Sequence, residues 1–227
     1  EAAAYNLVRP RSSCPHCGHA IAWFENIPVL SWLFLRGRCS QCGAAISSRY
    51  PLVEGLTGLL FGVAAWHWGF GMQAMAAWLL LAALIALTFI DLDTHLLPDN
   101  LTLPLAWIGL LVNLNGVFAP LHEAVVGAVA GYLSLWVVFH LFRLITGKEG
   151  MGFGDFKLLA ALGAWLGWKL LLPVVLCASL AGGVVGILLI LLAGHDRARP
   201  IPFGPWLALG GLVALFWGES LIQLWLG

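Results

Sequence analysis

The chain has 227 residues, of which 61% are hydrophobic and 10% are charged, and its eleven Lys and Arg balance eleven Asp and Glu. Soluble domains average about 25% charged residues, so the composition excludes an ordinary soluble protein, and it is far too apolar for a disordered one. Without a basic excess, the chain is not expected to bind nucleic acid by neutralising phosphates. The composition therefore indicates a protein of the lipid bilayer.

Polar residues are concentrated at the start of the chain. Residues 1–50 form the one polar block, and 51–227 are the apolar remainder. We therefore expect a small N-terminal domain over 1–50, followed by a membrane domain over 51–227. The chain begins with Glu1 rather than Met and has no signal-peptide pattern, so we expect it to be a piece of a longer protein.

Two Cys-x-x-Cys pairs lie in the polar block, Cys14 with Cys17 and Cys39 with Cys42, and a glycine follows each pair. Glycine allows the positive φ at which backbone amides point at sulfur. Two such turns supply four thiolates, which complete a tetrahedral zinc site without an open coordination position. We therefore expect a structural, not catalytic, zinc that holds this small domain together.

Two disulfides or a thioredoxin-like redox pair are the alternatives for these cysteines. Disulfides are disfavoured in the reducing cytosol, where the arginines place this block, and a redox pair would need a βαβ pattern. His16 and His19 are surplus to four thiolates and are interpreted as surface residues. Glu25 and Glu54 are candidates for a second activity, although their spacing does not say which.

Long stretches without Asp, Glu, Lys or Arg follow, the longest between Glu54 and Asp91. A membrane-crossing helix needs about 20 apolar residues. We expect seven crossings, with helices at 52–68, 73–90, 101–118, 123–142, 156–167, 170–193 and 203–226. The helix at 156–167 is the weakest, because it would reach only about 18 Å into a hydrocarbon core about 30 Å thick. Cys177 lies in one of these helices and is interpreted as a packing residue.

Seven crossings with residues 1–50 in the cytoplasm leave Lys169 as the one basic residue outside. This is the positive-inside bias of membrane proteins. The ten cytoplasmic basic residues would be Arg9, Arg11, Arg36, Arg38, Arg49, Arg143, Lys148, Lys157, Arg197 and Arg199.

Two aspartates lie at the predicted cytoplasmic edge of the membrane. Asp91 ends a helix, where the macrodipole disfavours an anion by about 0.3–1 kcal/mol, so helix stability does not explain it. Asp155 precedes a helix and is either its N-cap or, after the glycine-rich run 150–154, a residue in a backbone that approaches another chain closely. Asp99, after Pro98, is interpreted as a cap, and Asp93 as a solvated interface residue.

Asp91 and Asp155 fall on the same leaflet in this topology. Two carboxylates in a partly dry site hold one proton between them. The ionised carboxyl can take a proton from water while the protonated one hydrogen-bonds the scissile carbonyl of a peptide. The pair therefore predicts aspartyl proteolysis.

Several separated motifs run along the whole chain: the two cysteine pairs, Glu25-Asn26-Ile27-Pro28 with Ser31-Trp32, Arg49-Tyr50-Pro51 with Glu54, Asp91 to Asp99 with its Leu-Pro-Asp ending, and Gly152 to Asp155 with Phe156-Lys157-Leu158. In these motifs the sequence resembles the type IV prepilin peptidases, also called leader peptidase and N-methyltransferase. The Gly-x-Gly-Asp box is also similar to that of presenilin-like proteases.

The resemblance implies an all-α, multi-pass enzyme of the bacterial inner membrane. Such an enzyme cuts the basic leader from prepilins and pseudopilins on the cytoplasmic side and methylates the new amino terminus with S-adenosylmethionine. It puts the catalytic roles on Asp91 and Asp155 and the zinc on the four cysteines. The family usually has eight spans, so the first is expected to be missing here. The sequence shows no signature of the S-adenosylmethionine site.

Two other classes of protein remain as alternatives. One is a transporter with an aspartate ion relay, although transport favours acids near the bilayer midplane. The other is a non-catalytic scaffold for a pilus or secretion machine.

Overall fold

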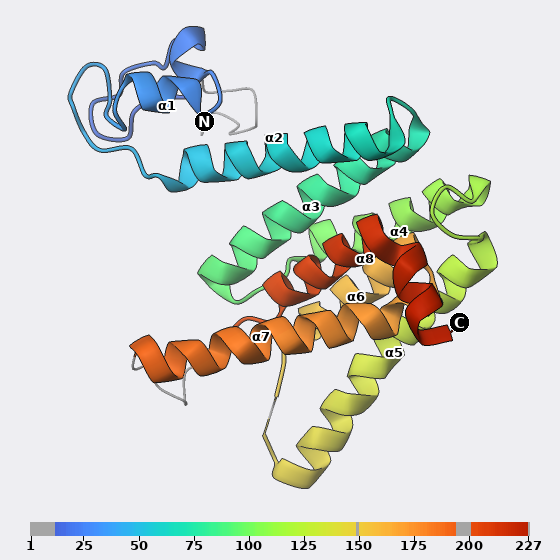
Figure 1. Ribbon diagram of the computed structural model, residues 1–227. Helices are drawn as coiled ribbons and strands as arrows, with labels where there is room; N and C mark the ends of the chain where they lie inside the picture. The colour runs from blue at the N-terminus through green and yellow to red at the C-terminus, as the bar shows by residue number, and fades with distance from the viewer. Residues whose placement is uncertain (1–11, 149, 194–200, 227) are drawn as a thin grey trace, which may run out of the picture. The chain divides into compact units, whose positions relative to one another are not determined.

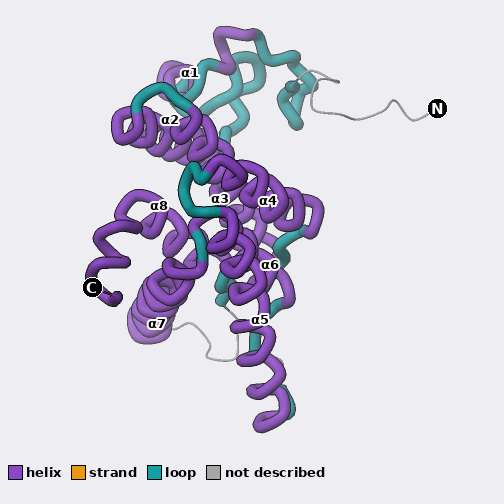
Figure 2. The backbone as a smooth tube through the Cα atoms, turned by 90° about the vertical axis from the view of Figure 1, so that its right-hand side faces the viewer, coloured by secondary structure: helices purple, strands orange, loops and turns teal. Residues whose placement is uncertain are grey.

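The computed structural model describes residues 12–148, 150–193 and 201–226. The chain divides into two compact units, 1–63 and 64–227, and the boundary falls inside helix α2 (Arg49–Trp68). Regular secondary structure in the described ranges is entirely helical (Figures 1 and 2). Arg9, Arg11, Arg197 and Arg199, which the predicted orientation counts, lie outside these ranges.

The first unit contains two short helices, η1 (Trp23–Asn26) and α1 (Leu30–Phe34), and two tight loops that carry the cysteine pairs. One antiparallel bridge closes each loop, between Ser13 and Ala20 and between Arg38 and Ala45. The glycine after each pair has a positive φ, 71° at Gly18 and 69° at Gly43. The two Cys-x-x-Cys sequences therefore fold into two equivalent turns, as predicted.

The second unit is a bundle of apolar helices connected by short loops (Figure 2). All seven predicted helices are confirmed, and their bounds shift by a few residues except at the end of α4. After α2 they are α3 (Met72–Thr94), α4 (Asp99–Val112) with η2 (Asn113–Asn115), α5 (Leu121–Thr146), α6 (Phe153–Leu166) with η3 (Trp168–Leu170), α7 (Leu171–Ala193) and α8 (Gly204–Leu226).

Four helices of the described chain are long and apolar enough to cross a membrane: α3, α5, α7 with its preceding turn, and α8. The chain is thus a membrane protein. Helices α4 and α6 have 14 residues each, about 21 Å of helix, which is short of the hydrocarbon thickness. The predicted count of seven crossings is therefore supported only as four candidate spans.

Helix α6 forms the core of the second unit and packs against α4, α5 and α8 (Figure 1). Ten of its 14 residues are buried. Gly127 and Gly131 of α5 lie directly against the α6 backbone, so that a Cβ at Gly131 would come within 2.6 Å of the Leu159 carbonyl oxygen. A helix that is enclosed by protein has little contact with lipid, so its length need not match the hydrocarbon thickness. This accounts for a short apolar helix at this position.

The predicted helix 101–118 is wrong at its end, because Asn113 stops α4 after Val112. The buried Asn113 amide donates to the carbonyl oxygens of Ala164 and Trp165, at 2.9 and 2.8 Å. Its side-chain oxygen accepts the backbone N–H groups of Phe118 and Ala119, at 3.0 and 3.1 Å. One side chain thus ends α4, orders the following loop and satisfies the last turn of α6.

Replacing Asn113 by Ala is expected to destabilise the second unit by about 3 kcal/mol or more, because each buried polar group left without a partner costs about 1–3 kcal/mol. The measurement is the thermal unfolding midpoint in a fixed detergent. Asn115→Ala is the matched control, since Asn115 is exposed two residues away. Equal midpoints for the two variants would contradict this role of Asn113.

Candidate active site and metal centre

Asp91 lies in the last turn of α3 and is buried, with 5% of its surface exposed. Its Oδ2 accepts the backbone N–H of Gly204, the first residue of α8, at 3.0 Å. The end of its own helix disfavours the anion, but the amino-terminal end of α8 favours it. Gly204 could not be found from the sequence, because it is 113 residues from Asp91 and a glycine has no side-chain group that marks it.

Asp155 is the third residue of α6 and is also buried, with 6% exposed. The N-cap of α6 is Gly152, so the N-cap interpretation of Asp155 is wrong. A Cβ at Gly154 would come within 2.6 Å of Leu97 Cβ. The glycine before Asp155 therefore permits close approach by another segment, which is the second interpretation that the sequence offered.

The structure brings Asp91 and Asp155 close enough for their charges to repel each other. Leu97 packs against the backbone at Gly154, next to Asp155, and at Gly204, which binds Asp91. A Cβ at Gly204 would come 3.2 Å from Leu97 Cδ1 and 2.5 Å from Asp91 Oδ2. Two carboxyl groups that share a buried site resist ionising together, so a pair of this kind can share one proton. Such a pair can act as general base and general acid in one reaction.

The two other aspartates of this region differ from the pair. Asp99 is the first residue of α4, whose N-cap is Pro98, so the cap interpretation is wrong. Its carboxylate pairs with Lys157 Nζ at 2.5 Å and ties the start of α4 to α6, two residues after Asp155. Asp93 is exposed, as expected.

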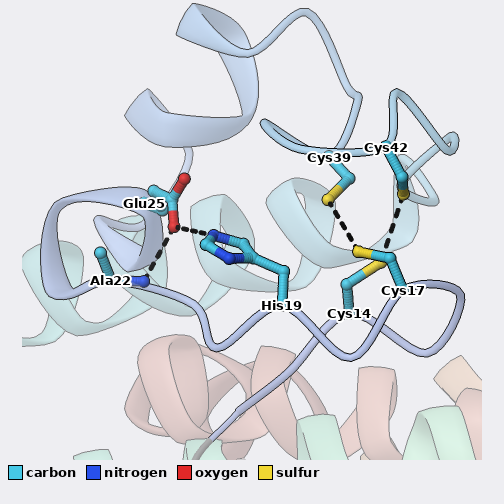
Figure 3. Close-up of polar contacts among 7 residues, drawn as sticks. All are labelled: Cys14, Cys17, His19, Ala22, Glu25, Cys39 and Cys42. Atoms are coloured by element: carbon cyan, nitrogen blue, oxygen red, sulfur yellow. Dashed lines mark hydrogen bonds and ion pairs between the residues drawn. The ribbon is translucent and has the colours of Figure 1, made fainter.

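The four cysteines of the first unit converge on one point (Figure 3). Their Sγ atoms all lie within 4.8 Å of one another, with 3.8 Å from Cys14 to Cys42 and 4.0 Å from Cys17 to Cys39. A tetrahedron with Zn–S bonds of about 2.3 Å has edges of about 3.8 Å. The cluster therefore fits a zinc ion, and none of the four cysteines forms a disulfide.

Backbone amides in the two turns favour the thiolate form that a metal requires. The N–H groups of Cys17 and His16 lower the pKa of Cys14 to about 7. Those of Cys42 and Gln41 likewise lower the pKa of Cys39. The amide of His19 acts in the same direction on Cys17, but desolvation and the neighbouring thiols outweigh it and raise that pKa to about 12. Without a metal, the cluster therefore keeps some of its thiol protons, and a bound cation would displace these protons.

Glu25 connects the first cysteine loop to η1 (Figure 3). Its Oε2 accepts the Ala22 N–H at 2.8 Å and lies 3.2 Å from His19 Nε2. The Ser40 hydroxyl, followed by the Ala22 amide, lowers the pKa of Glu25, so this carboxyl is ionised at neutral pH. His16 is exposed, as expected, whereas His19 is half-buried and held by Glu25.

Fold and sites together define a helical membrane protein with a buried carboxylate pair and a cluster of four thiols that could hold a metal ion. The model of the type IV leader peptidase family matches residues 78–187, and that of the bacterial peptidase A24 N-terminal domain matches 2–68. No solved structure matches the chain.

Several proteins named prepilin leader peptidase/N-methyltransferase are close relatives. The one from Aeromonas salmonicida is 60% identical over 222 residues, which cover 98% of this chain and 76% of the relative. The one from Pseudomonas aeruginosa is 55% identical over 224 residues, 99% of this chain and 77% of the relative. The chain belongs to the type IV leader peptidase family, as its sequence motifs indicated.

Proposed function

We propose that the chain is a membrane aspartyl endopeptidase that cleaves the leader from type IV prepilins and pseudopilins and then N-methylates the new amino terminus. Asp91 and Asp155 are the proposed catalytic pair. The observation that carries this proposal is their burial within reach of each other's charge, in a chain 60% identical to a prepilin leader peptidase/N-methyltransferase.

In the proposed cleavage, the ionised carboxyl of the pair takes a proton from water, and the water oxygen attacks the scissile carbonyl. The protonated carboxyl hydrogen-bonds the carbonyl oxygen as negative charge develops there. The proton then passes to the leaving amine. Burial keeps bulk water from the pair, and the N–H of Gly204 orients Asp91.

Two groups from outside the chain complete the proposal. Cys14, Cys17, Cys39 and Cys42 would hold one structural zinc, for which their sulfur geometry is suited. S-adenosylmethionine would supply an activated methyl group to the amine that cleavage releases. Four sulfur ligands leave the zinc no position for substrate, so its part is to hold the first unit in shape.

The experiment for the whole proposal is incubation of the purified protein with a prepilin peptide, followed by mass spectrometry. Loss of the leader and a gain of one methyl group on the new amino terminus are the expected results. A transporter or a non-catalytic scaffold would leave the peptide intact.

The proposed topology has seven crossings in the bacterial inner membrane, with the first unit and the carboxylate pair on the cytoplasmic side. Arg143, Lys148 and Lys157 flank Asp155 in the sequence, as the positive-inside rule expects at a cytoplasmic edge. Thr94 at the end of α3 and Lys148 after α5 are both exposed. A prepilin would meet the pair as an extended segment, because a helix engages its scissile carbonyl in an internal hydrogen bond.

Single cysteines at Thr94 and at Lys148 are expected to react with a membrane-impermeant thiol reagent from the cytoplasmic side. Lys148 is the better position than Gly150, where a Cβ would come within 2.9 Å of Phe142. Labelling is compared in inside-out and right-side-out vesicles of a Cys177→Ala background, and the labelled peptide is identified by mass because the four cluster cysteines remain. Labelling mainly from the periplasmic side would invert the proposed topology.

A further inference from the structure

The first unit exposes a group of large apolar side chains on its two short helices. Trp23 and Phe24 of η1 and Leu30, Leu33 and Phe34 of α1 each have between 52% and 83% of their surface exposed. The two helices pack against each other, and the rings of Trp23 and Phe24 meet edge to face with their centroids 5.8 Å apart. These five residues are called the aromatic face below. Apolar side chains that gather on a surface in this way mark an interaction site.

We propose that the aromatic face inserts into the interfacial region of an anionic lipid leaflet and docks the first unit on the membrane. The lipid is that of the bilayer in which the helices of the second unit lie. Docking of this kind requires only that the chain is a membrane protein, so it stands apart from the proposed cleavage and methylation.

The two sides of α1 differ, which is the first reason for this assignment. Ser31 is buried, and its hydroxyl donates to the Ile27 carbonyl oxygen. The Trp32 indole donates from Nε1 to the Ile46 carbonyl oxygen at 3.1 Å. These two side chains attach α1 to the rest of the unit, and its other three residues all belong to the aromatic face. The face is therefore the outer side of an anchored helix.

The attachment of α1 to α2 is the second reason. Val29, directly before α1, has a φ of 61°, a conformation that a β-branched residue rarely adopts. Its N–H donates to Glu54 Oε2 in the second turn of α2, at 2.8 Å. This contact fixes α1 beside the start of the helix through which the first unit continues into the apolar remainder of the chain.

Helix α2 is itself apolar on its outer surface. After Glu54 it contains no Asp, Glu, Lys or Arg. Leu52, Leu56 and Leu59 are exposed, and their spacing of four and three residues puts them on one side of the helix. The aromatic face is thus attached to a helix that is suited to lipid contact from its first turns.

Charge is the third reason, and it selects an anionic leaflet. Residues 26–35 contain no charged side chain, and the exposed Arg36 and Arg38 follow directly. The nearby Glu25 is turned inward, where its carboxylate accepts the Ala22 N–H and lies beside His19. The segment therefore presents apolar and positive groups together. Anionic lipid attracts such arginines, and Trp, Phe and Leu are the side chains that insert at this depth.

A peptide partner fits the same surface less well. The basic leader of a prepilin would be repelled by Arg36 and Arg38. A partner helix that lies along a groove needs several turns of contact, whereas α1 has five residues. A lipid surface requires neither a groove nor a negative side chain.

The test is photolabelling of the full chain, zinc-loaded in nanodiscs of phosphatidylglycerol that contain a trace of phosphatidylglycerol with a diazirine near its glycerol backbone. After irradiation, the label on each tryptic peptide is measured by mass. Peptide 12–36 contains the whole aromatic face, and peptide 39–49 contains the second cysteine turn of the same unit and none of the face. Label per residue is expected to be at least fivefold higher on 12–36. Equal label on the two peptides would overturn the proposal, whatever the variants show.

Replacing Trp23 and Phe34 together by Ser is expected to lower the label on peptide 12–36 at least fivefold, with one zinc per chain retained. Phe70→Ser is the matched control, because Phe70 is 89% exposed but belongs to the second unit. The control is expected to keep the label on 12–36 within twofold. A double variant that is labelled as strongly as the unsubstituted protein would contradict insertion of the face.

Lipid composition tests the charge without any substitution. When phosphatidylcholine replaces phosphatidylglycerol in both the nanodisc and the photoprobe, the label on 12–36 is expected to fall at least threefold. Label on peptide 50–143, which contains α3, should stay within twofold. Equal labelling of 12–36 in the two lipids would overturn an anionic leaflet as the occupant. Label confined to residues 50–227 in both lipids would overturn docking itself and assign the aromatic face to a protein contact.

Discussion

Replacing either Asp91 or Asp155 by Asn is expected to reduce leader cleavage by about 10³-fold or more, because general acid and base catalysis contribute up to about 10⁴-fold. An amide keeps the size of the carboxyl but cannot take up or release the proton. The measurement is the rate of leader release from a prepilin peptide, followed by mass. Neither variant is expected to lose zinc, since the cysteines belong to the other unit.

Asp93→Asn is the matched control for this experiment. Asp93 lies on the same helix two residues after Asp91, but it is exposed, whereas Asp91 is buried. The control is expected to cleave at nearly the normal rate. Substantial cleavage by Asp91→Asn, combined with a loss in Asp93→Asn, would transfer the catalytic role to Asp93.

Both aspartate variants should still methylate a pilin peptide whose leader has already been removed. The carboxylate pair belongs to the second unit, and the transfer of a methyl group to an amine that is already free needs no peptide cleavage. Loss of methylation along with cleavage would indicate that the substitutions damage the whole protein. This measurement therefore separates a catalytic role from a structural one.

The helices could be predicted from the sequence because long apolar segments without charged residues are costly to expose to water and stable in lipid. The end of α4 could not be predicted in the same way. The run continues past Val112, but the amide of Asn113 makes two hydrogen bonds to the distant backbone of α6 and two to the loop that follows. Tertiary hydrogen bonds of this kind leave no trace in local composition.

The candidate sites likewise differ in whether their contacts are local in the sequence or come from distant segments. The cysteine centre could be predicted because all of its geometry lies within two short turns, at Gly18 and at Gly43. The surroundings of Asp91 could not, since its partner Gly204 comes from a helix 113 residues later. The Asp99–Lys157 ion pair likewise joins two helices, and the sequence alone favoured a local cap.

Replacing Cys14 and Cys17 together by Ser is expected to abolish zinc binding, from one ion per chain to none. Two ligands of four are removed, and structural zinc sites contribute about 10–16 kcal/mol of apparent binding free energy in small domains. Few buried apolar residues are available to hold the first unit without the metal: of the side chains described before residue 64, Cys14 is the one in the buried apolar core. The unit around the cluster is therefore expected to unfold.

Methylation should fall at least tenfold more than cleavage in this double variant, because the carboxylate pair that cleaves the leader belongs to the other unit, which the zinc does not hold together. Metal analysis of protein purified without chelator, together with both activities, makes the measurement. Cys177→Ser is the matched control, since Cys177 lies in α7 and outside the cluster, and it should keep its zinc. An absence of zinc from the unsubstituted protein would overturn the assignment of the metal, and an equal loss of both activities would show that cleavage depends on the first unit as strongly as methylation does.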